Sequence, residues 1–199
     1  MVKENRFQLW SLLFSYRNYY ENIDGKRVIC DEILGFSIPA NWAFSHISQV
    51  SSYGFTNLRR NIKLGDWLLE LEDIKSGSEE LDSIKYVNKN TNLNSKVSFN
   101  KGMILYNKLR PYLNKVLIAI NDGVATSEIV PFWAFINEQY LILFYRTPYF
   151  LNKVTNLMYG VKMPRLGTED MRNTIIPVPP LKEQERIVKK IQTIDLVIE

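Results

Sequence analysis

The first twenty residues carry apolar side chains at helical spacing. Leu9 and Trp10 are followed by Leu13 and Phe14, so one stripe of a helix over residues 5–20 would be apolar. The sequence Asn-Ile-Asp-Gly then follows, and this combination is typical of a turn. The pattern therefore predicts one amphipathic helix that ends at this turn.

Beyond this turn the apolar runs become short, and turn residues separate them. Such runs are typical of strands that pack one face on a core. We expect a short strand or turn at 26–33, and strands at 42–50, 65–74, 83–89, 101–109, 114–120 and 128–135. Pro111 separates the runs at 101–109 and 114–120, because proline lacks the backbone N–H that a strand needs. Asn-Asp-Gly at 121–123 predicts a turn.

The last third of the chain returns to helical spacing. Residues 137–160 predict a helix that breaks at Pro148, and residues 168–174 predict a short helix whose first residue, a threonine, is the expected cap. Between them lies a basic loop. Three prolines within 175–180 favour an extended, polyproline-like arm. This order of elements predicts an α+β fold, with a mixed or mainly antiparallel twisted sheet and flanking helices.

A charged amphipathic pattern follows the prolines. It has the seam of a coiled-coil-type helix, with isoleucines at spacings of four, three and four. The apolar positions are Leu181, Ile187, Ile191, Ile194 and Ile198. Such a helix either packs on its own domain or pairs with another helix. Because a stiff proline arm should hold the helix away from its domain, we expect a partner helix.

Composition narrows the chemistry that the chain can perform. Cys30 is the only cysteine and His46 the only histidine, which excludes an intrachain disulfide, a cysteine-rich zinc site and a multi-histidine metal site. We interpret His46 as structural. Neither a signal peptide nor a membrane-length apolar run is evident, so we expect a cytoplasmic protein without membrane contact. The 25 aromatic residues (11 Tyr, 10 Phe and 4 Trp) either pack a core or stack on a ligand or nucleic acid.

Charge is distributed unevenly along the chain, although the net charge is only +4. Seven acidic residues lie between Asp66 and Asp82, whereas residues 88–121 and 139–168 contain several lysines and arginines but no acid. This asymmetry produces either a cationic face for a phosphate backbone or an ordinary solvated basic surface.

Several segments together resemble a known family. "IPVPPLKEQERIVKKI" is similar to the sequence at which the target recognition domain of type I restriction–modification specificity subunits passes into a conserved spacer helix. Five further segments resemble the family in the same order: "IPANW", "GDWLLELEDIKSG", "KGMILYNKLRPYLNKVLIA", "DGVATSEIVPF" and "YGVKMPRLG". The resemblance covers about residues 38–199. One segment alone would be weak, whereas this ordered set is specific.

The resemblance implies a non-catalytic subunit that reads half of a bipartite double-stranded DNA site. In the family, methyltransferase subunits dock on the specificity subunit, and a motor-nuclease restriction subunit completes the complex. This chain is then expected to bind no cofactor, because S-adenosylmethionine, ATP and magnesium belong to the partner subunits. The implied domains are an N-terminal helix and lead-in at 1–37, a DNA target recognition domain at 38–176, and a proline arm with the start of the spacer helix at 177–199.

The sequence departs from the family pattern in one major way. It carries one recognition domain and only the start of one spacer helix, where the family has two recognition domains joined by paired helices. Three interpretations remain open: a shortened form, a gene fragment, or a half-subunit. A half-subunit would pair through the helix with a second copy or a second recognition domain.

Three segments supply side chains suited to reading DNA. The stretch at 105–115 combines cations for phosphates, amides for adenine and rings for stacking, and two further loops add hydroxyls and cations. The predicted DNA-binding residues are Asn107, Lys108, Arg110, Tyr112, Asn114, Lys115, Thr126, Ser127, Lys162 and Arg165, with Arg59 and Arg60 as further cations. Glu128 either contacts a cytosine amine, orients an arginine or serves as a buried ion-pair partner.

Two other function classes remain as alternatives. The first is a small metal-dependent nuclease that uses Asp66, Asp73 and Lys75. Only seven residues separate the two aspartates, which is tight for elements that must converge on a metal ion. The second is a protein-interaction adaptor that binds no DNA. The sequence has no glycine-rich phosphate loop of the kind that motor ATPases need.

Overall fold

The computed structural model describes residues 20–23, 26–29, 37–55 and 62–198. At 20–23, 26–29 and 195–198 it describes the backbone alone. The chain divides into two compact units, one formed by Ile47–Thr174 and the other by the flanking segments Met1–His46 and Ile175–Glu199. The helix predicted over 5–20 lies outside the described residues, except that its last residue begins a strand instead.

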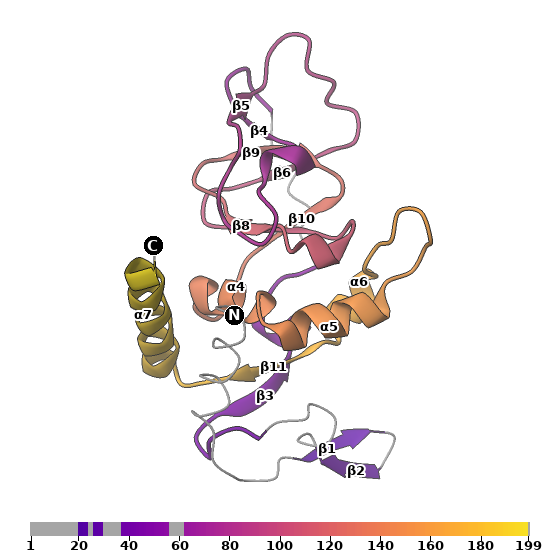
Figure 1. Cartoon of the computed structure of the whole chain (residues 1–199). Helices are drawn as coiled ribbons and strands as arrows, with labels where there is room; N and C mark the ends of the chain where they lie inside the picture. Colours follow the sequence, from indigo (N-terminus) through magenta and orange to yellow (C-terminus); the bar gives the residue numbers. More distant parts are fainter. Residues whose placement is uncertain (1–19, 24–25, 30–36, 56–61, 199) are drawn as a thin grey trace. The chain divides into compact units, whose positions relative to one another are not determined.

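The unit Ile47–Thr174 contains a four-stranded mixed sheet, a three-stranded antiparallel sheet and short helices in its described part (Figure 1). Its strands are β4 (Trp67–Leu69), β5 (Lys85–Tyr86), β6 (Lys96–Phe99), β7 (Ile104–Asn107), β8 (Val116–Ile118), β9 (Gly123–Thr126) and β10 (Ile129–Phe132). Its helices are α3 (Ile47–Val50), α4 (Glu138–Tyr145), α5 (Pro148–Leu157) and α6 (Thr168–Arg172), with 3-10 turns η1 (Leu71–Asp73) and η2 (Pro111–Leu113). The predicted α+β class with a mixed, mainly antiparallel sheet is confirmed.

The four-stranded sheet has the order β5-β4-β9-β6, and its one parallel pair joins β4 to β9. Residues 121–123 were predicted as a turn, but Gly123 begins β9 opposite Trp67. A Cβ at Gly123 would lie 2.3 Å from the Trp67 carbonyl oxygen. Glycine is therefore required here because the two backbones approach closely. In the sequence alone, a glycine after Asn-Asp is more readily interpreted as part of a turn.

Several predicted strands end earlier than their apolar runs suggest. The run at 65–74 leaves β4 after Leu69, because the Asp73 carboxylate accepts from the Glu70 backbone N–H at 2.8 Å and closes the η1 turn. The run at 42–50 is a strand only as far as His46 and then becomes the helix α3. The strands β6 and β9 were not predicted, since an asparagine-rich loop precedes β6 and a glycine begins β9.

Apolar side chains from both sheets form the core of this unit. A cluster of buried residues joins them: Trp67, Leu69, Ile74, Phe99, Met103, Leu105, Leu117, Ala119, Ala125 and Ile129. A second cluster is aromatic, with Tyr145 stacked on Phe150 at 4.6 Å between ring centroids and edge-on to Tyr106 at 5.5 Å. Many of the aromatic side chains therefore pack against one another in the core, in the stacked and edge-on arrangements that aromatic rings prefer.

The helical region breaks where the sequence predicts. Helix α4 ends at Tyr145, and Thr147 caps α5 by accepting from the Phe150 N–H at 3.2 Å. Pro148 occupies the first helical position, where a missing N–H costs nothing. The cap of α6 is Gly167 and not the predicted threonine, which is the first helical residue.

The flanking unit contains two antiparallel strand pairs and a helix in its described part. These are β1 (Tyr20–Ile23) with β2 (Lys26–Ile29), β3 (Ala43–His46) with β11 (Ile175–Val178), and α7 (Leu181–Ile198). The predicted polyproline arm is thus partly a strand, with Pro177 opposite Phe44. A two-stranded ladder accepts a proline because each strand is an edge. The boundaries predicted at 37/38 and 176/177 stay predictions, and the compact unit Ile47–Thr174 falls between them.

Helix α7 forms where the heptad pattern predicts, but its early turns are covered. Ile187 and Val188 are 5% and 9% exposed, and the buried Gln184 amide donates to the Pro179 carbonyl at 2.8 Å. The expectation that the proline arm holds this helix away from its domain stays a prediction. Leu181 is exposed. Ile191 and Ile194 are half-buried, and the Ile198 side chain lies outside the described residues. Over the part of the chain that the structure describes, no helix is both apolar and long enough to span a bilayer.

Candidate nucleic-acid interface

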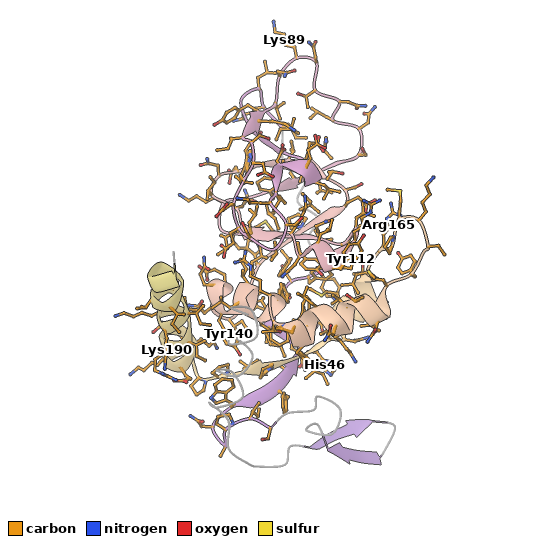
Figure 2. The ribbon with its side chains drawn as sticks, in the orientation of Figure 1. His46, Lys89, Tyr112, Tyr140, Arg165 and Lys190 are labelled. Atoms are coloured by element: carbon orange, nitrogen blue, oxygen red, sulfur yellow. The ribbon has the colours of Figure 1, made fainter. Side chains whose placement is uncertain are left out.

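Three loops that are distant in the sequence meet on one surface of the unit Ile47–Thr174. The Lys108 N–H donates to the Glu128 carbonyl at 3.0 Å, the Leu166 N–H donates to the Lys108 carbonyl at 3.0 Å, and the Arg110 N–H donates to the Pro164 carbonyl at 2.7 Å. We call residues 108–114, 126–128 and 158–166 together the three-loop surface. Figure 2 shows Tyr112 and Arg165 on the same side of the molecule.

The first loop is fixed in place by Asn107, which the sequence suggested as a reader of adenine. This side chain is 2% exposed. Its amide donates to the Leu109 carbonyl at 2.7 Å and its oxygen accepts from the Leu109 N–H at 2.9 Å. Both ends of the amide are thus occupied by backbone groups, and Asn107 is a structural residue and not a base contact.

The same loop presents Arg110 and Tyr112 outward. The η2 turn lies between two left-handed residues, Arg110 at φ 50° and Asn114 at φ 48°. Pro111 fixes the φ of the first turn residue. Left-handed backbone at non-glycine residues costs about 1–3 kcal/mol and persists only where surrounding bonds impose it. The loop therefore holds the exposed Arg110 and the 47% exposed Tyr112 ring in a prearranged position.

Asn114 and Lys115 do not contribute to this surface. Asn114 is 5% exposed. Lys115 is half-buried, and its ammonium donates to the Leu71 carbonyl at 2.7 Å. Both predicted DNA contacts are therefore corrected, because neither side chain is exposed on this surface. Lys115 is engaged by the η1 turn, whereas Asn114 is buried and its side-chain oxygen accepts no hydrogen bond among the described residues.

An ion pair joins the second loop to the third. The Arg165 guanidinium donates to the Glu128 carboxylate from Nη2 at 2.7 Å and from Nε at 3.1 Å. Hydrogen bonds from Arg165 hold the pKa of Glu128 below its usual range, because they outweigh the opposing effect of partial burial. Glu128 is therefore the structural ion-pair partner that the sequence allowed, and Arg165 is used mainly to position the third loop.

The third loop closes on itself as a narrow hairpin. Tyr159 and Arg165 exchange two backbone hydrogen bonds, of 3.0 and 2.9 Å. Gly160 adopts φ 88°, which lets the chain turn directly after this neck. The tip exposes Lys162 together with Val161 and Met163. The sequence pointed to Lys162. The two apolar neighbours were not predicted as site residues, because apolar residues in a sequence are more often buried than exposed.

Of the remaining predicted contacts, two lie on the second loop of the three-loop surface. Ser127 is exposed and Thr126 half-exposed at the end of β9, next to Glu128. Arg59 and Arg60 lie outside the described residues. Among the side chains that the structure describes, no acid forms an ion pair with Arg110, Lys108 or Lys162. The three-loop surface therefore presents Arg110 and Lys162 unneutralised, which is what a phosphate backbone requires, whereas Lys108 is half-buried and attracted to the Glu128 carboxylate.

The residues of the nuclease alternative are engaged elsewhere. The Asp73 carboxylate is 1% exposed; it accepts from Ser83 at 2.5 Å and pairs with the Lys85 ammonium at 2.6 Å. Burial alone would raise the pKa of Asp73, but the bonds from Lys85 and Ser83 outweigh it and lower that pKa. Asp66 accepts from the Lys63 N–H, and Lys75 pairs with Glu80. Within the described ranges, no group of three or more His, Cys, Asp or Glu residues could hold a metal ion.

The comparison with protein families decides where the chain belongs. The family described as the type I restriction modification DNA specificity domain matches residues 55–199. The chain belongs to this family. Its match includes all three loops of the three-loop surface and the whole of α7.

The curated relatives that match the chain are specificity subunits of type I restriction enzymes. Over 157 residues the chain is 27% identical to the specificity subunit of the type I restriction enzyme EcoDI of Escherichia coli. Over 181 residues it is 28% identical to that of EcoAI, also of Escherichia coli. These matches include 78% and 80% of the chain but 35% and 29% of the relatives. The chain thus spans about a third of the length of the curated relatives it matches.

Solved structures share the fold. The HsdS subunit of Thermoanaerobacter tengcongensis matches with a TM-score of 0.69 at 21% identity, over 82% of this chain and 44% of that chain. A chain from a structural study of complex assembly and conformational transition in a type I restriction–modification system matches with a TM-score of 0.66 at 19% identity, over the same shares of the two chains. At these identities the likeness concerns the fold.

Proposed function

We propose that this chain is a non-catalytic, sequence-specific DNA-recognition module of a type I restriction–modification enzyme. It reads one half of a bipartite site in double-stranded DNA, as a specificity subunit or half-subunit. The observation that carries the proposal is the convergence of three loops on one prearranged surface, of which the first and the third bear cations. Family membership supports it, because the matched family is named for DNA specificity.

The contacts divide by chemistry. Arg110, Lys108 and Lys162 carry the charges that phosphates attract, and Ser127 offers a hydroxyl. The Tyr112 ring and the Arg110 guanidinium project from a turn whose conformation is already fixed, so little ordering entropy opposes binding. An arginine in such a position can also donate two hydrogen bonds to guanine in the major groove. No chemical step belongs to the chain, and S-adenosylmethionine, ATP and magnesium are used by partner subunits.

Binding to labelled duplex DNA, followed by fluorescence anisotropy across a salt series, tests this proposal. The affinity should fall steeply with salt, and the logarithmic slope should decrease by about 0.9 for each phosphate contact that is lost. We expect Arg110→Ala with Lys162→Ala to reduce the slope by about 2 on that basis, with an unchanged melting temperature. Lys75→Ala is the matched control, since Lys75 is exposed but paired with Glu80. Absence of duplex binding, or binding without salt dependence, would contradict the proposal and favour a protein adaptor.

We further propose that α7 is the docking element for another helix, from a second recognition domain, a second copy or a methyltransferase subunit. Ile187 is already covered, so the half-buried Ile191 and Ile194 are the available part of the seam. A restriction subunit would then join the assembled complex.

Sedimentation velocity, of the chain alone and with the methyltransferase subunit, tests the role of α7. Ile191→Asp with Ile194→Asp should abolish association, because each places a charge in an apolar seam. Lys190→Asp is the matched control on the exposed face. Association that survives the double change in both experiments would rule out this docking role.

A further inference from the structure

The tip of the third loop is apolar as well as basic. Val161 is fully exposed, and Tyr159 and Met163 are 59% and 47% exposed. Single exposed apolar residues are normal on a soluble protein, but here three lie within five residues on one hairpin. Figure 1 shows this loop, between α5 and α6, projecting away from the helices.

The loop cannot fold these side chains back onto the core without breaking its anchors. Tyr159 and Arg165 close the neck, and the Glu128 carboxylate holds Arg165. The Pro164 carbonyl accepts from the Arg110 N–H at 2.7 Å, which joins the hairpin to the first loop. Val161 is β-branched and has few rotamers. The hairpin therefore presents a short, stiff apolar projection.

The surroundings of this projection identify its partner. Lys162 lies between the two apolar residues, Arg110 is attached to the base of the hairpin, and no acid occurs between residues 139 and 168. An apolar protein pocket does not require cations around the inserted side chain. Duplex DNA does, because phosphates line both sides of a groove. Proteins that bend DNA insert apolar side chains between base pairs while neighbouring cations hold the backbone.

We propose that Val161 and Met163 form an apolar wedge that enters a groove of the bound duplex and partly unstacks one base step. This inference rests on the proposed function. It adds that the module bends its DNA and favours sequences that deform easily, such as pyrimidine–purine steps, at a position where no hydrogen bond to a base is made.

The test uses the whole chain and a short duplex that it selects from a randomised pool, labelled at both ends for energy transfer. The wild-type chain should shorten the end-to-end distance and should bind about tenfold more tightly when a mismatch weakens the stack at the wedge, since the unstacking cost falls. Val161→Thr with Met163→Gln keeps side-chain size but removes the apolar surface. This double variant should lose the bend and the mismatch preference while keeping the wild-type salt slope.

Two controls separate the outcomes. Ile84→Thr changes an exposed apolar residue outside the three-loop surface and should leave both signals intact. Lys162→Ala should reduce the salt slope but keep the bend. Salt-dependent duplex binding without bending, or bending that survives the double change, overturns the wedge and leaves the proposed function standing. Absence of duplex binding by the wild-type chain overturns the proposed function itself. A double variant that still bends DNA but no longer binds the methyltransferase subunit would identify the tip as a protein contact.

Discussion

The segment Asp66–Asp82 and the three-loop surface carry opposite charges, and the chain uses those charges in opposite ways. Ion pairs engage most acids of the segment: Glu70–Lys96, Glu72–Lys85, Asp73–Lys85, Glu79–Arg146 and Glu80–Lys75. On the three-loop surface one arginine is neutralised, by Glu128, while Arg110 and Lys162 face solvent. The acidic segment therefore uses most of its charges within the chain, whereas the basic loops keep charge available for a ligand.

The comparison also explains why the acids do not form a metal site. Carboxylates that serve a cation must point at one centre, whereas these point at different lysines, arginines and backbone groups. Their attraction to cations is satisfied within the chain. The basic loops differ from the acidic segment, because mainly backbone hydrogen bonds hold them in place and not ion pairs between side chains. Their cationic side chains are left for contacts outside the chain.

The largest expected effect comes from removing the most buried acid. Asp73→Ala leaves the Glu70 N–H and the Ser83 hydroxyl without their acceptor and the Lys85 ammonium without its closest partner. We expect a loss of about 3 kcal/mol in unfolding free energy, as for other broken buried pairs. Chemical denaturation measures it. The neighbouring Glu72→Ala is the control, because that exposed side chain meets Lys85 only at the surface, and its melting temperature should be nearly unchanged. An equal loss of unfolding free energy in Asp73→Ala and Glu72→Ala would contradict the expectation that the buried carboxylate contributes more to stability than the exposed one.

A smaller effect is expected for Glu128→Gln, at the one place where the three-loop surface uses an acid internally. The pKa of Glu128 is lowered by hydrogen bonds from Arg165, so the stabilisation is fully present above the usual pKa of about 4.3. It is lost as pH falls through the lower pKa of the folded state. The melting temperature of the variant should be about 3 °C below wild type at pH 6, on the usual scale for a domain of this size.

The two melting curves should then begin to converge as the pH falls below about 4.3, because the wild-type carboxyl also becomes neutral once the pH passes through its lowered pKa in the folded state. A constant difference from pH 6 to pH 3 would show that the charge on Glu128 does not hold the hairpin. Unchanged duplex affinity at pH 6, beside the lower melting temperature, would show that the backbone bonds alone hold the third loop in place.

These contrasts show where sequence reasoning succeeds. Apolar alternation located β4, β7, β8 and β10, and the helix break at Pro148 followed from one missing donor. The sequence also drew attention to the first and third loops, because a loop rich in cations and framed by Gly and Pro is recognisable without coordinates; their role in binding DNA stays a prediction. What the sequence did not provide was the partner of each polar side chain.

Those partners depend on contacts between distant residues. Asn107 and Asn114 resemble base-reading amides in a list of residues, yet both are buried. The partner of Arg165 lies 37 residues earlier, on another loop. An amide or guanidinium offers the same donors to a backbone carbonyl as to a base. Only the folded chain decides between the two uses, and only there does the apolar tip of the third loop become visible as an exposed feature.

The smallest expected effect belongs to a lysine that the sequence assigned to DNA and the structure assigns to the fold. Lys115 donates to the Leu71 carbonyl at 2.7 Å. Lys115→Met keeps the aliphatic stem but leaves that carbonyl without its donor, which should cost about 1 kcal/mol of unfolding free energy. The salt slope of duplex binding should stay at the wild-type value, in contrast to Arg110→Ala, which should reduce the slope at unchanged stability. If Lys115→Met instead lowers the slope by about 1 and leaves stability intact, Lys115 contacts phosphate. In that case Lys115 would present its charge to a ligand, although its hydrogen bond to Leu71 places it among the charges used within the fold.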